Sequence, residues 1–413
     1  MFEDIEAVLH YIEQKTNFKL GLFRVEAFLK EAVIPYQNLK YVHVGGTNGK
    51  GSVTFYLSNI LINSGYKTGM FSSPSLEGHN DRIRVNNQFI SDEAIISFVN
   101  KYYDLIEKTQ LTMFEIDVVM ALAYFCEQEV DIAVLEVGMG GAFDGTNVIK
   151  PLVSVITNIG LEHIQYLGDT KEAIAQTKSG IIKEHSFVVT AEQDRACLAI
   201  IKKMAQTKHS KVIEVKAAEV ISLNPIIFNY ATYQHLELKS LANYQIANVA
   251  CVLEVIKILN NDYHFNITEQ AMRMTLLNVV WPGRFEIISR QPLIVIDGAH
   301  NEEGIKELIL TLGKFKDYRK TIMFAALTDK PTDKMVEMLI ATGSEVIITE
   351  FDFYRTKKAA EINKNFKLKV VKDYKRYIAT KREVMENDEM LIITGSLYFI
   401  TIIRKFLLEG AAF

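Results

Sequence analysis

Two kinds of hydrophobic pattern alternate along this chain. Short runs rich in β-branched residues predict buried strands, and these fall at 40–44, 131–138 and 151–160. Longer segments in which apolar residues recur every three or four positions predict helices, and these fall at 50–64, 91–108, 113–129, 171–183 and 241–260. Strands that alternate with helices in this way indicate a mostly parallel sheet with helices on both faces.

The alternation is interrupted at 279–292, where Pro282, Gly283 and Pro292 lie close together. It then restarts with a strand-like "LIVID" and helical patterns near 302–313 and 332–341. We therefore predict two α/β domains, 1–285 and a smaller 286–413. Domains of this kind usually bind ligands in the cleft between them, at the carboxyl ends of their strands.

Composition narrows the class of protein. A chain of 413 residues is long for one core, which agrees with two domains. The net charge of −4 provides no basic field for nucleic acid. No apolar run reaches the roughly 18 residues of a membrane span, and the acidic N-terminal segment does not resemble a signal peptide. The three cysteines are widely spaced and odd in number, which argues against disulfides and a zinc site. We expect a cytoplasmic protein.

A glycine-rich loop, "GGTNGKGS" at 45–52, joins the first strand to a helix. Glycines allow backbone N–H groups to approach a phosphate, and a helix N-terminus adds partial positive charge. Lys50 would neutralise phosphate charge, and Ser52 could bind Mg²⁺ or a phosphate oxygen. The spacing differs from the common P-loop, because Val44 stands where its first glycine would be and Gly51 where its hydroxyl residue would be. A plain turn with a surface lysine is the alternative.

Other polar residues stand at the ends of apolar strands. Glu136 ends one strand, and a buried carboxylate needs a cation or donors. His163 follows the next strand, and Lys178 lies on the following helix. Asp297 and His300 form a polar tip after "LIVI", where a helix cap is the alternative role for Asp297. Glu136, His163 and Lys178, at the ends of neighbouring strands, together predict a cluster that handles both anions and a divalent cation.

Several motifs in order resemble the folylpolyglutamate synthase and dihydrofolate synthase family of the Mur ligase superfamily. They are "GGTNGKGS", "FSSPSL…DRIRVN", "FEIDVVMALAYF…DIAVLEVGMGGAFDGTNVI", "TNIGLEHIQYLGDT", "GRFE…IDGAHN", "TDK" and "ITGSLYFI". They span nearly the whole chain. The resemblance implies a mostly parallel-sheet, P-loop-type ATPase domain followed by a smaller Rossmann-like α/β domain.

The resemblance also implies a role for each matched residue. Lys50 and the loop residues Gly46, Thr47, Asn48, Gly49, Gly51 and Ser52 would hold the phosphates of ATP. Ser73 and Glu136 would ligate one Mg²⁺ and His163 a second. Lys178 matches a lysine that is carbamylated in this family. Gln245, Asn248, Arg284, Asp297 and His300 would grip the nucleotide from the hinge and second domain, and Lys50, His163, Lys178, Arg284 and His300 form the catalytic set.

The implied activity is that of an ATP-dependent acid–amino-acid ligase in folate biosynthesis and one-carbon metabolism. It would add L-glutamate to the γ-carboxylate of a (tetrahydro)folate through an acyl phosphate, giving folylpolyglutamates, ADP and phosphate. The alternatives are a bifunctional or dedicated dihydrofolate synthase acting on dihydropteroate, and a catalytically inactive nucleotide-binding homologue. We expect a monomer, with no nucleic-acid or membrane partner.

Five positions depart from the family pattern. Ala142 stands where Arg is common, Gly145 where Ala is usual and Ser75 where His or an aromatic residue is common. Glu162 stands in place of Asp, and Thr177 in place of the Glu that usually precedes the lysine. We expect these departures to lie around the acceptor substrate and to leave the ATP side intact.

Overall fold

The computed structural model describes residues 1–16 and 21–409. Within this part the chain forms two compact units: Met1–Ala218 with Ile246–Leu277, and Glu219–Gln245 with Asn278–Phe413. The second unit thus includes a segment that precedes the predicted boundary at 285/286 in the sequence, and that boundary stays a prediction. No helix among the described residues is long and apolar enough to span a membrane.

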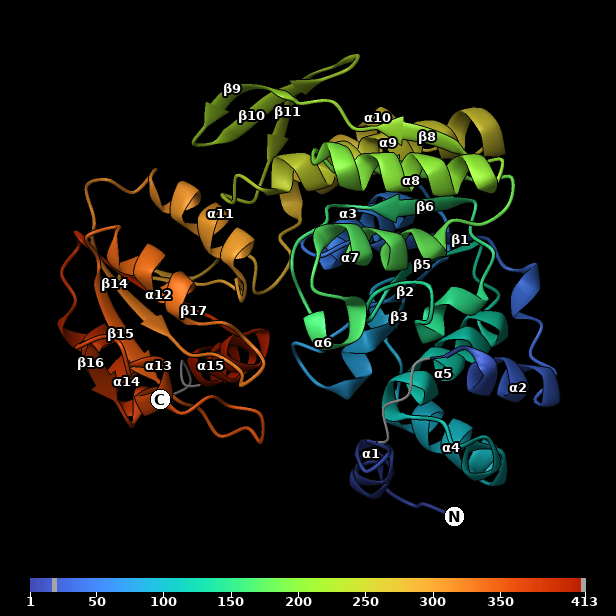
Figure 1. Cartoon of the computed structure of the whole chain (residues 1–413), viewed down its shortest axis with the longest axis horizontal. Coiled ribbons are helices and arrows are strands. Elements are labelled where there is room, and N and C mark those ends of the chain that lie inside the picture. Colours follow the sequence, from blue (N-terminus) through green and yellow to red (C-terminus); the bar gives the residue numbers. More distant parts are fainter. Residues whose placement is uncertain (17–20, 410–413) are drawn as a thin grey trace. The chain divides into compact units, whose positions relative to one another are not determined.

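The first unit is built on an eight-stranded sheet in the order β4-β3-β2-β5-β1-β6-β7-β8 (Figure 1). Its strands are β1 (Tyr41–Gly45), β2 (Thr68–Phe71), β3 (Ile83–Val85), β4 (Gln88–Phe89), β5 (Ile132–Glu136), β6 (Val153–Ile156), β7 (Phe187–Thr190) and β8 (Lys211–Glu214). All pairs from β2 to β8 are parallel, and β3 and β4 add an antiparallel edge. The predicted, mostly parallel sheet is confirmed.

Among the described residues, the first unit has ten α-helices. They are α1 (Ile5–Glu13), α2 (Phe23–Glu31), α3 (Lys50–Asn63), α4 (Asp92–Thr109), α5 (Met113–Glu127), α6 (Ile164–Leu167), α7 (Lys171–Lys178), α8 (Arg195–Thr207), α9 (Gln245–Tyr263) and α10 (Glu269–Asn278). The strands that carry the site, β1 and β5, are completely buried, as parallel strands with covered faces must be.

The second unit contains two sheets. A six-stranded sheet has the order β12-β13-β17-β14-β15-β16, and only β12 is antiparallel to its neighbour. Its strands are β12 (Glu286–Arg290), β13 (Leu293–Ile296), β14 (Arg319–Phe324), β15 (Glu345–Thr349), β16 (Lys369–Val371) and β17 (Glu389–Thr394). Its helices are α11 (Glu302–Leu312), α12 (Asp333–Ile340), α13 (Ala359–Ile362), α14 (Tyr374–Val384) and α15 (Leu397–Glu409). The Rossmann-like character is confirmed.

A separate three-stranded antiparallel sheet was not predicted. It consists of β9 (Glu219–Leu223), β10 (Ile226–Tyr230) and β11 (Tyr233–Leu238). In β10 buried and half-buried residues alternate, so only one face of this strand is fully covered.

Helix α5 is connected to helix α2 by a buried ion pair. Thr112 and Glu115 form a capping box at its N-terminus. The Glu115 carboxylate also accepts hydrogen bonds from the Arg24 guanidinium of α2, at 2.7 to 3.1 Å, and both side chains are buried. One carboxylate therefore begins α5 and ties it to α2.

We expect Glu115→Ala to lower the free energy of unfolding by about 3–5 kcal/mol, because it leaves the Arg24 guanidinium buried without its counter-charge. Urea denaturation measures this value. The control is Glu31→Ala, which removes the ion pair with Lys108; those side chains are 51% and 65% exposed, so the loss should stay below about 1 kcal/mol. Equal losses in the two variants would contradict the prediction.

Candidate functional site

The loop between β1 and α3 depends on two glycines. Gly49 is the N-cap of α3 with φ +87°, and no side chain caps this helix start. Gly46 has φ +132°, and a Cβ there would lie 1.9 Å from Thr157 Oγ1. A Cβ on Gly49 would lie 2.2 Å from Asn248 Oδ1. The backbone therefore reaches a helix N-terminus in a form suited to an anion, and only glycine fits both positions.

The loop after β6 braces this glycine-rich loop. The Thr47 N–H donates to the Asn158 carbonyl oxygen and the Asn48 N–H donates to Asn158 Oδ1, both at 2.9 Å. The Thr157 hydroxyl donates to the Asn48 carbonyl oxygen at 2.6 Å. Two of the amides expected to hold phosphate are thus engaged within the protein. The first turn of α3, which contains Lys50, Gly51 and Ser52, has no side-chain cap, and its role in binding an anion stays a prediction.

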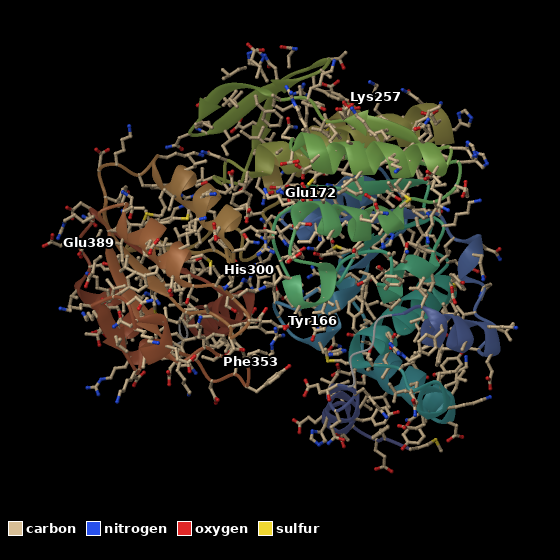
Figure 2. All side chains as sticks on the ribbon, in the orientation of Figure 1. Tyr166, Glu172, Lys257, His300, Phe353 and Glu389 are labelled. Carbon is tan, nitrogen blue, oxygen red and sulfur yellow. The ribbon has the colours of Figure 1, made fainter. Side chains whose placement is uncertain are left out.

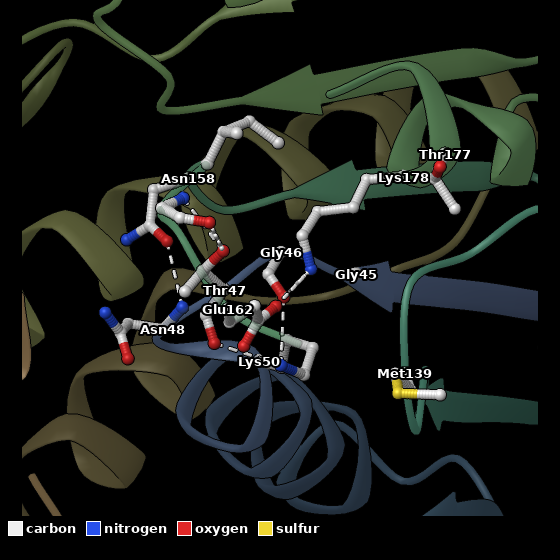
Figure 3. Close-up of polar contacts among 12 residues, drawn as sticks. Gly45, Gly46, Thr47, Asn48, Lys50, Met139, Asn158, Glu162, Thr177 and Lys178 are labelled. Atoms are coloured by element: carbon white, nitrogen blue, oxygen red, sulfur yellow. Dashed lines mark hydrogen bonds and ion pairs between the residues drawn. The ribbon is translucent and has the colours of Figure 1, made fainter. Parts of the chain in front are cut away.

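Two lysines converge on one backbone oxygen (Figure 3). Lys50 Nζ lies 2.9 Å from the Gly46 carbonyl oxygen, and Lys178 Nζ lies 2.8 Å from the same atom. Lys178 also pairs with Glu162 Oε1 at 2.5 Å, and both side chains are buried. The structure thus brings Lys50 and Lys178 together, although they are far apart in the sequence.

Burial and neighbouring charges set the ionisation of this cluster. Burial lowers the pKa of Lys178 below its usual value, and the charge of Lys50 adds to this effect, whereas Glu162 opposes it. Burial alone would raise the pKa of Glu162, but the charges of Lys178 and Lys50 hold it at about 2. Because this folded-state pKa lies below the ordinary 4.5, the pair stabilises the fold above that pH and loses this contribution as the pH falls toward 2.

The proposed metal-binding residues lie beside this cluster in the sheet order. Glu136 ends β5 and is paired in register with Val44 of β1. The Ser73 N–H donates to Glu136 Oε2 at 3.2 Å, so these two residues are neighbours. His163 is half-buried and begins α6 with φ +46°. Among the described residues no group of three His, Cys, Asp or Glu side chains is placed to hold a metal by itself. A hydroxyl and a carboxylate beside a phosphate loop do fit Mg²⁺, which commonly takes one or two protein oxygens plus phosphate and water.

In the second unit the predicted residues lie in one turn. Asp297 is buried and accepts hydrogen bonds at 2.8 Å from the Tyr244 hydroxyl and from the N–H groups of Phe285 and Ala299. Burial raises its pKa, while these hydrogen bonds and Arg284 lower it. Asn301, not Asp297, caps α11. Asp297 therefore orders the turn from within.

Arg284 and His300 stand on the two sides of Gly298. A Cβ on Gly298 would lie 2.4 Å from Arg284 Nη1, and His300 Nδ1 lies 2.8 Å from the Gly298 carbonyl oxygen. Both side chains are half-buried (His300 in Figure 2). Gln245, at the start of α9, is completely buried. Asn248, one turn later, belongs to the first unit with Gly49.

Two departures from the family pattern are neighbours. The Ala142 N–H donates to the Thr177 carbonyl oxygen at 2.9 Å, and Asn147 Nδ2 donates to the carbonyl oxygens of Ala142 and Gly180. Thr177 directly precedes Lys178, which reaches the phosphate loop. Ala142 and Thr177 are thus joined next to Lys178, and the expected place of these departures around the acceptor substrate stays a prediction.

The segment 158–168 also exposes apolar side chains, namely Leu161, Ile164 and Tyr166 (Tyr166 in Figure 2).

Three residues that hold the site in place, Thr157, Asn158 and Tyr244, were not predicted from the sequence. Thr157 and Asn158 stand in "ITNIG", at the end of a predicted strand, which is their only signal in the sequence. No local signal identified Tyr244.

Family models match both parts of the chain. The Mur ligase middle domain matches residues 44–256, and the Mur ligase glutamate ligase domain matches residues 283–397. The fold and the site thus define a Mur-type ligase. Among curated proteins, the chain is 34% identical to the dihydrofolate synthase/folylpolyglutamate synthase of Bacillus subtilis, with 98% of each chain covered. It is 33% identical to the folylpolyglutamate synthase of Lacticaseibacillus casei, covering 91% of this chain and 92% of that protein.

Solved structures agree. A folylpolyglutamate synthase from Thermotoga maritima superposes with a TM-score of 0.85 at 32% identity, covering 98% of this chain and 97% of that one. A bifunctional folylpolyglutamate synthase/dihydrofolate synthase with Mn, AMPPNP and L-glutamate bound has a TM-score of 0.86 at 26% identity, with 98% of each chain covered. The chain belongs to the folylpolyglutamate synthase/dihydrofolate synthase family of Mur ligases.

We expect Gly49→Ala to lower the affinity for ATP about tenfold, or ~1.4 kcal/mol, because the new methyl group meets Asn248 and shifts the start of α3. Isothermal titration with a non-hydrolysable ATP analogue measures the affinity.

The control is Gly65→Ala. Gly65 has φ +88°, almost the same as Gly49, and a Cβ there would have no neighbour within 4 Å. It therefore reproduces the backbone strain without the clash. If both variants bind the analogue like the wild type, the close approach at Gly49 does not shape the nucleotide site.

Proposed function

We propose that this chain is an ATP-dependent ligase that joins L-glutamate to the γ-carboxylate of a folate and releases ADP and phosphate. The observation that carries the proposal is the uncapped N-terminus of α3, where Lys50 and Lys178 converge beside Glu136 and Ser73. Relatives that this chain matches over nearly their whole length are named for this activity.

The chemistry requires activation of a poor electrophile. A folate carboxylate attacks the γ-phosphorus of ATP, the bond to the β,γ-bridging oxygen breaks, and an acyl phosphate and ADP form. The amine of L-glutamate then attacks the acyl carbon, phosphate leaves, and the amine loses a proton. Both reactants of the first step are anionic, so Lys50 lowers the repulsion between them.

Ser73 and Glu136 would hold one Mg²⁺, and His163 would contribute to a second. When bound, the ions neutralise charge on the triphosphate. The residues of this chain would supply the oxygen ligands, the phosphate-binding helix start and the positive charge of Lys50. Arg284 and His300 of the second unit are proposed to bind phosphate or carboxylate groups, and Asp297 to hold their turn in place. Gln245 and Asn248 remain proposed nucleotide contacts.

We propose in addition that Lys178 is carbamylated in the working enzyme. Carbamylation needs a neutral amine, whose nitrogen bonds to the carbon of CO₂ as one proton leaves. Burial lowers the pKa of Lys178 toward that form, and Glu162 works against it by stabilising the ammonium. The modified group would carry a negative charge, so Glu162 would have to leave this position.

Dihydropteroate is a second candidate acceptor, because the Bacillus subtilis relative carries both activities in its name. A catalytically inactive homologue is not favoured, since Lys50, Glu136 and Lys178 are present and lie in one unit. The monomeric state and the cytoplasmic location stay predictions.

ADP release that depends on both glutamate and acceptor tests the ligase reaction. Tetrahydrofolate and dihydropteroate are supplied separately, and product masses identify which acceptor gains a glutamyl group. Lys50→Ala should lower the rate at least about 100-fold, the typical loss for a charge that stabilises a transition state. If neither acceptor raises ADP release above background in the wild type, the proposed reaction is wrong.

Lys178→Ala should reduce turnover strongly, because it removes the group proposed to become a carbamate. A short carboxylic acid added to this variant should restore part of the rate, and the wild type should gain activity with added bicarbonate. Lys178→Arg serves as the control, because it retains a positive charge and cannot form the carbamate. Equal activity in Lys178→Arg and wild type would remove the carbamate from the mechanism.

A further inference from the structure

A buried carboxylate in α5 has no role so far. Asp117 is completely buried, among neighbours on the same helix that are apolar and equally covered, such as Ile116, Val118 and Val119. Burying a charge in such a place is costly unless it is paired. An apolar side chain would satisfy the packing of this helix, so the partners of Asp117 indicate what the carboxylate does.

Both partners lie on one short segment, the 3-10 helix His79–Arg82 between β2 and β3. Asp117 Oδ1 is 2.7 Å from His79 Nε2, and Asp117 Oδ2 is 3.4 Å from Arg82 Nη1. Both partner side chains are 9% exposed. A single carboxylate therefore fixes two positions of the β2–β3 connection onto α5.

Further hydrogen bonds join other residues of that connection to one another. The Asp81 carboxylate accepts the N–H groups of Leu76 and Glu77 at 2.6 and 2.7 Å. The Ser72 N–H donates to the Arg82 carbonyl oxygen at 2.9 Å. The end of the His79–Arg82 segment is therefore hydrogen-bonded directly to Ser72.

The next residue, Ser73, is where the connection meets the proposed metal site. Its N–H donates to Glu136 Oε2. A continuous series of contacts thus leads from Asp117 through Arg82 and Ser72 to the Ser73–Glu136 pair. Asp117 itself touches neither Ser73 nor Glu136 in any hydrogen bond or ion pair of the described residues.

We propose that Asp117 is a positioning residue for the metal site: its hydrogen bond with His79 and its ion pair with Arg82 hold Ser73 at the distance from Glu136 that binding of Mg²⁺ with ATP requires. The inference rests on the proposed function, because it takes Ser73 and Glu136 as the metal-binding pair. Residues that orient metal ligands typically change metal affinity by about 10- to 100-fold when they are altered.

The test uses the full-length protein and measures Mg²⁺ dependence of the binding of a non-hydrolysable ATP analogue, so no turnover is needed. We expect Asp117→Asn to raise the Mg²⁺ concentration for half-maximal binding about tenfold. The amide has the same shape but loses the charge that attracts Arg82. His79→Phe should give a similar shift, and His79→Gln, which keeps an N–H donor, should recover most of the wild-type value.

Glu115→Gln is the matched control, because Glu115 is a second buried carboxylate on α5 that pairs with Arg24 and has no bond to the β2–β3 connection. It should lower stability in urea and leave the Mg²⁺ dependence within about twofold, well under the tenfold shift expected at Asp117. A shift in Glu115→Gln as large as in Asp117→Asn would overturn the proposal, since any loss of stability would then suffice. Folded Asp117→Asn and His79→Phe proteins with wild-type Mg²⁺ dependence would overturn it too.

Glu136→Gln separates this proposal from the function it rests on. If Glu136→Gln binds the analogue with unchanged Mg²⁺ dependence, the metal site itself is wrongly assigned. If Glu136→Gln is impaired and Asp117→Asn is not, the metal site stands and the positioning role falls. Should Asp117→Asn fail to fold, the pair His79→Phe and His79→Gln decides alone.

Discussion

Two lysine ammonium groups that share one backbone oxygen set the main constraint on the first unit. Lys50 and Lys178 both approach the Gly46 carbonyl oxygen within 2.9 Å. Their mutual repulsion in a poorly solvated place is tolerable only with negative charge close by. Glu162 supplies that charge in the structure, and its low pKa reflects how strongly the two cations act on it. The triphosphate of a bound nucleotide would supply further negative charge.

This constraint explains the steric details around the loop. For both ammonium groups to reach one carbonyl oxygen, Gly46 must present its backbone openly, and it packs so tightly on Thr157 that no Cβ fits. The loop must then be held from the other side, which Asn158 does through the N–H groups of Thr47 and Asn48. Those amides donate within the protein, and the start of α3 presents backbone N–H groups without a side-chain cap.

Much of this could be predicted from the sequence, and the exceptions have physical causes. The parallel strands were predictable because burial on both faces forces continuous apolar runs, as in β1 and β5. The three-stranded sheet β9–β11 was not predicted, although β9 contains Val220, Ile221 and Leu223. These side chains are exposed in the structure, so the burial of this strand differs from that of the core strands. Lys50 was singled out because it lies in a glycine-rich loop before a helix, and Glu136 because it ends a strand. The pairing of Lys178 with Glu162 was not, since neither residue shows in the sequence which oxygen its side chain will reach.

Sequence patterns are least informative about buried carboxylates that orient other side chains. Asp117 and Asp297 are both buried aspartates, yet only the one at a strand end was recognisable from its position. Asp297 accepts hydrogen bonds from three segments of its own unit. Arg284 and His300 lie half-buried at the turn that these bonds order. Asp117 lies in the middle of an apolar helix, where periodicity predicts only packing. In both cases the carboxylate binds other groups of the protein. These bonds hold the neighbouring side chains in one geometry before any ligand binds. Such preorganisation is a property of pairs distant in sequence, and only the fold brings those pairs together.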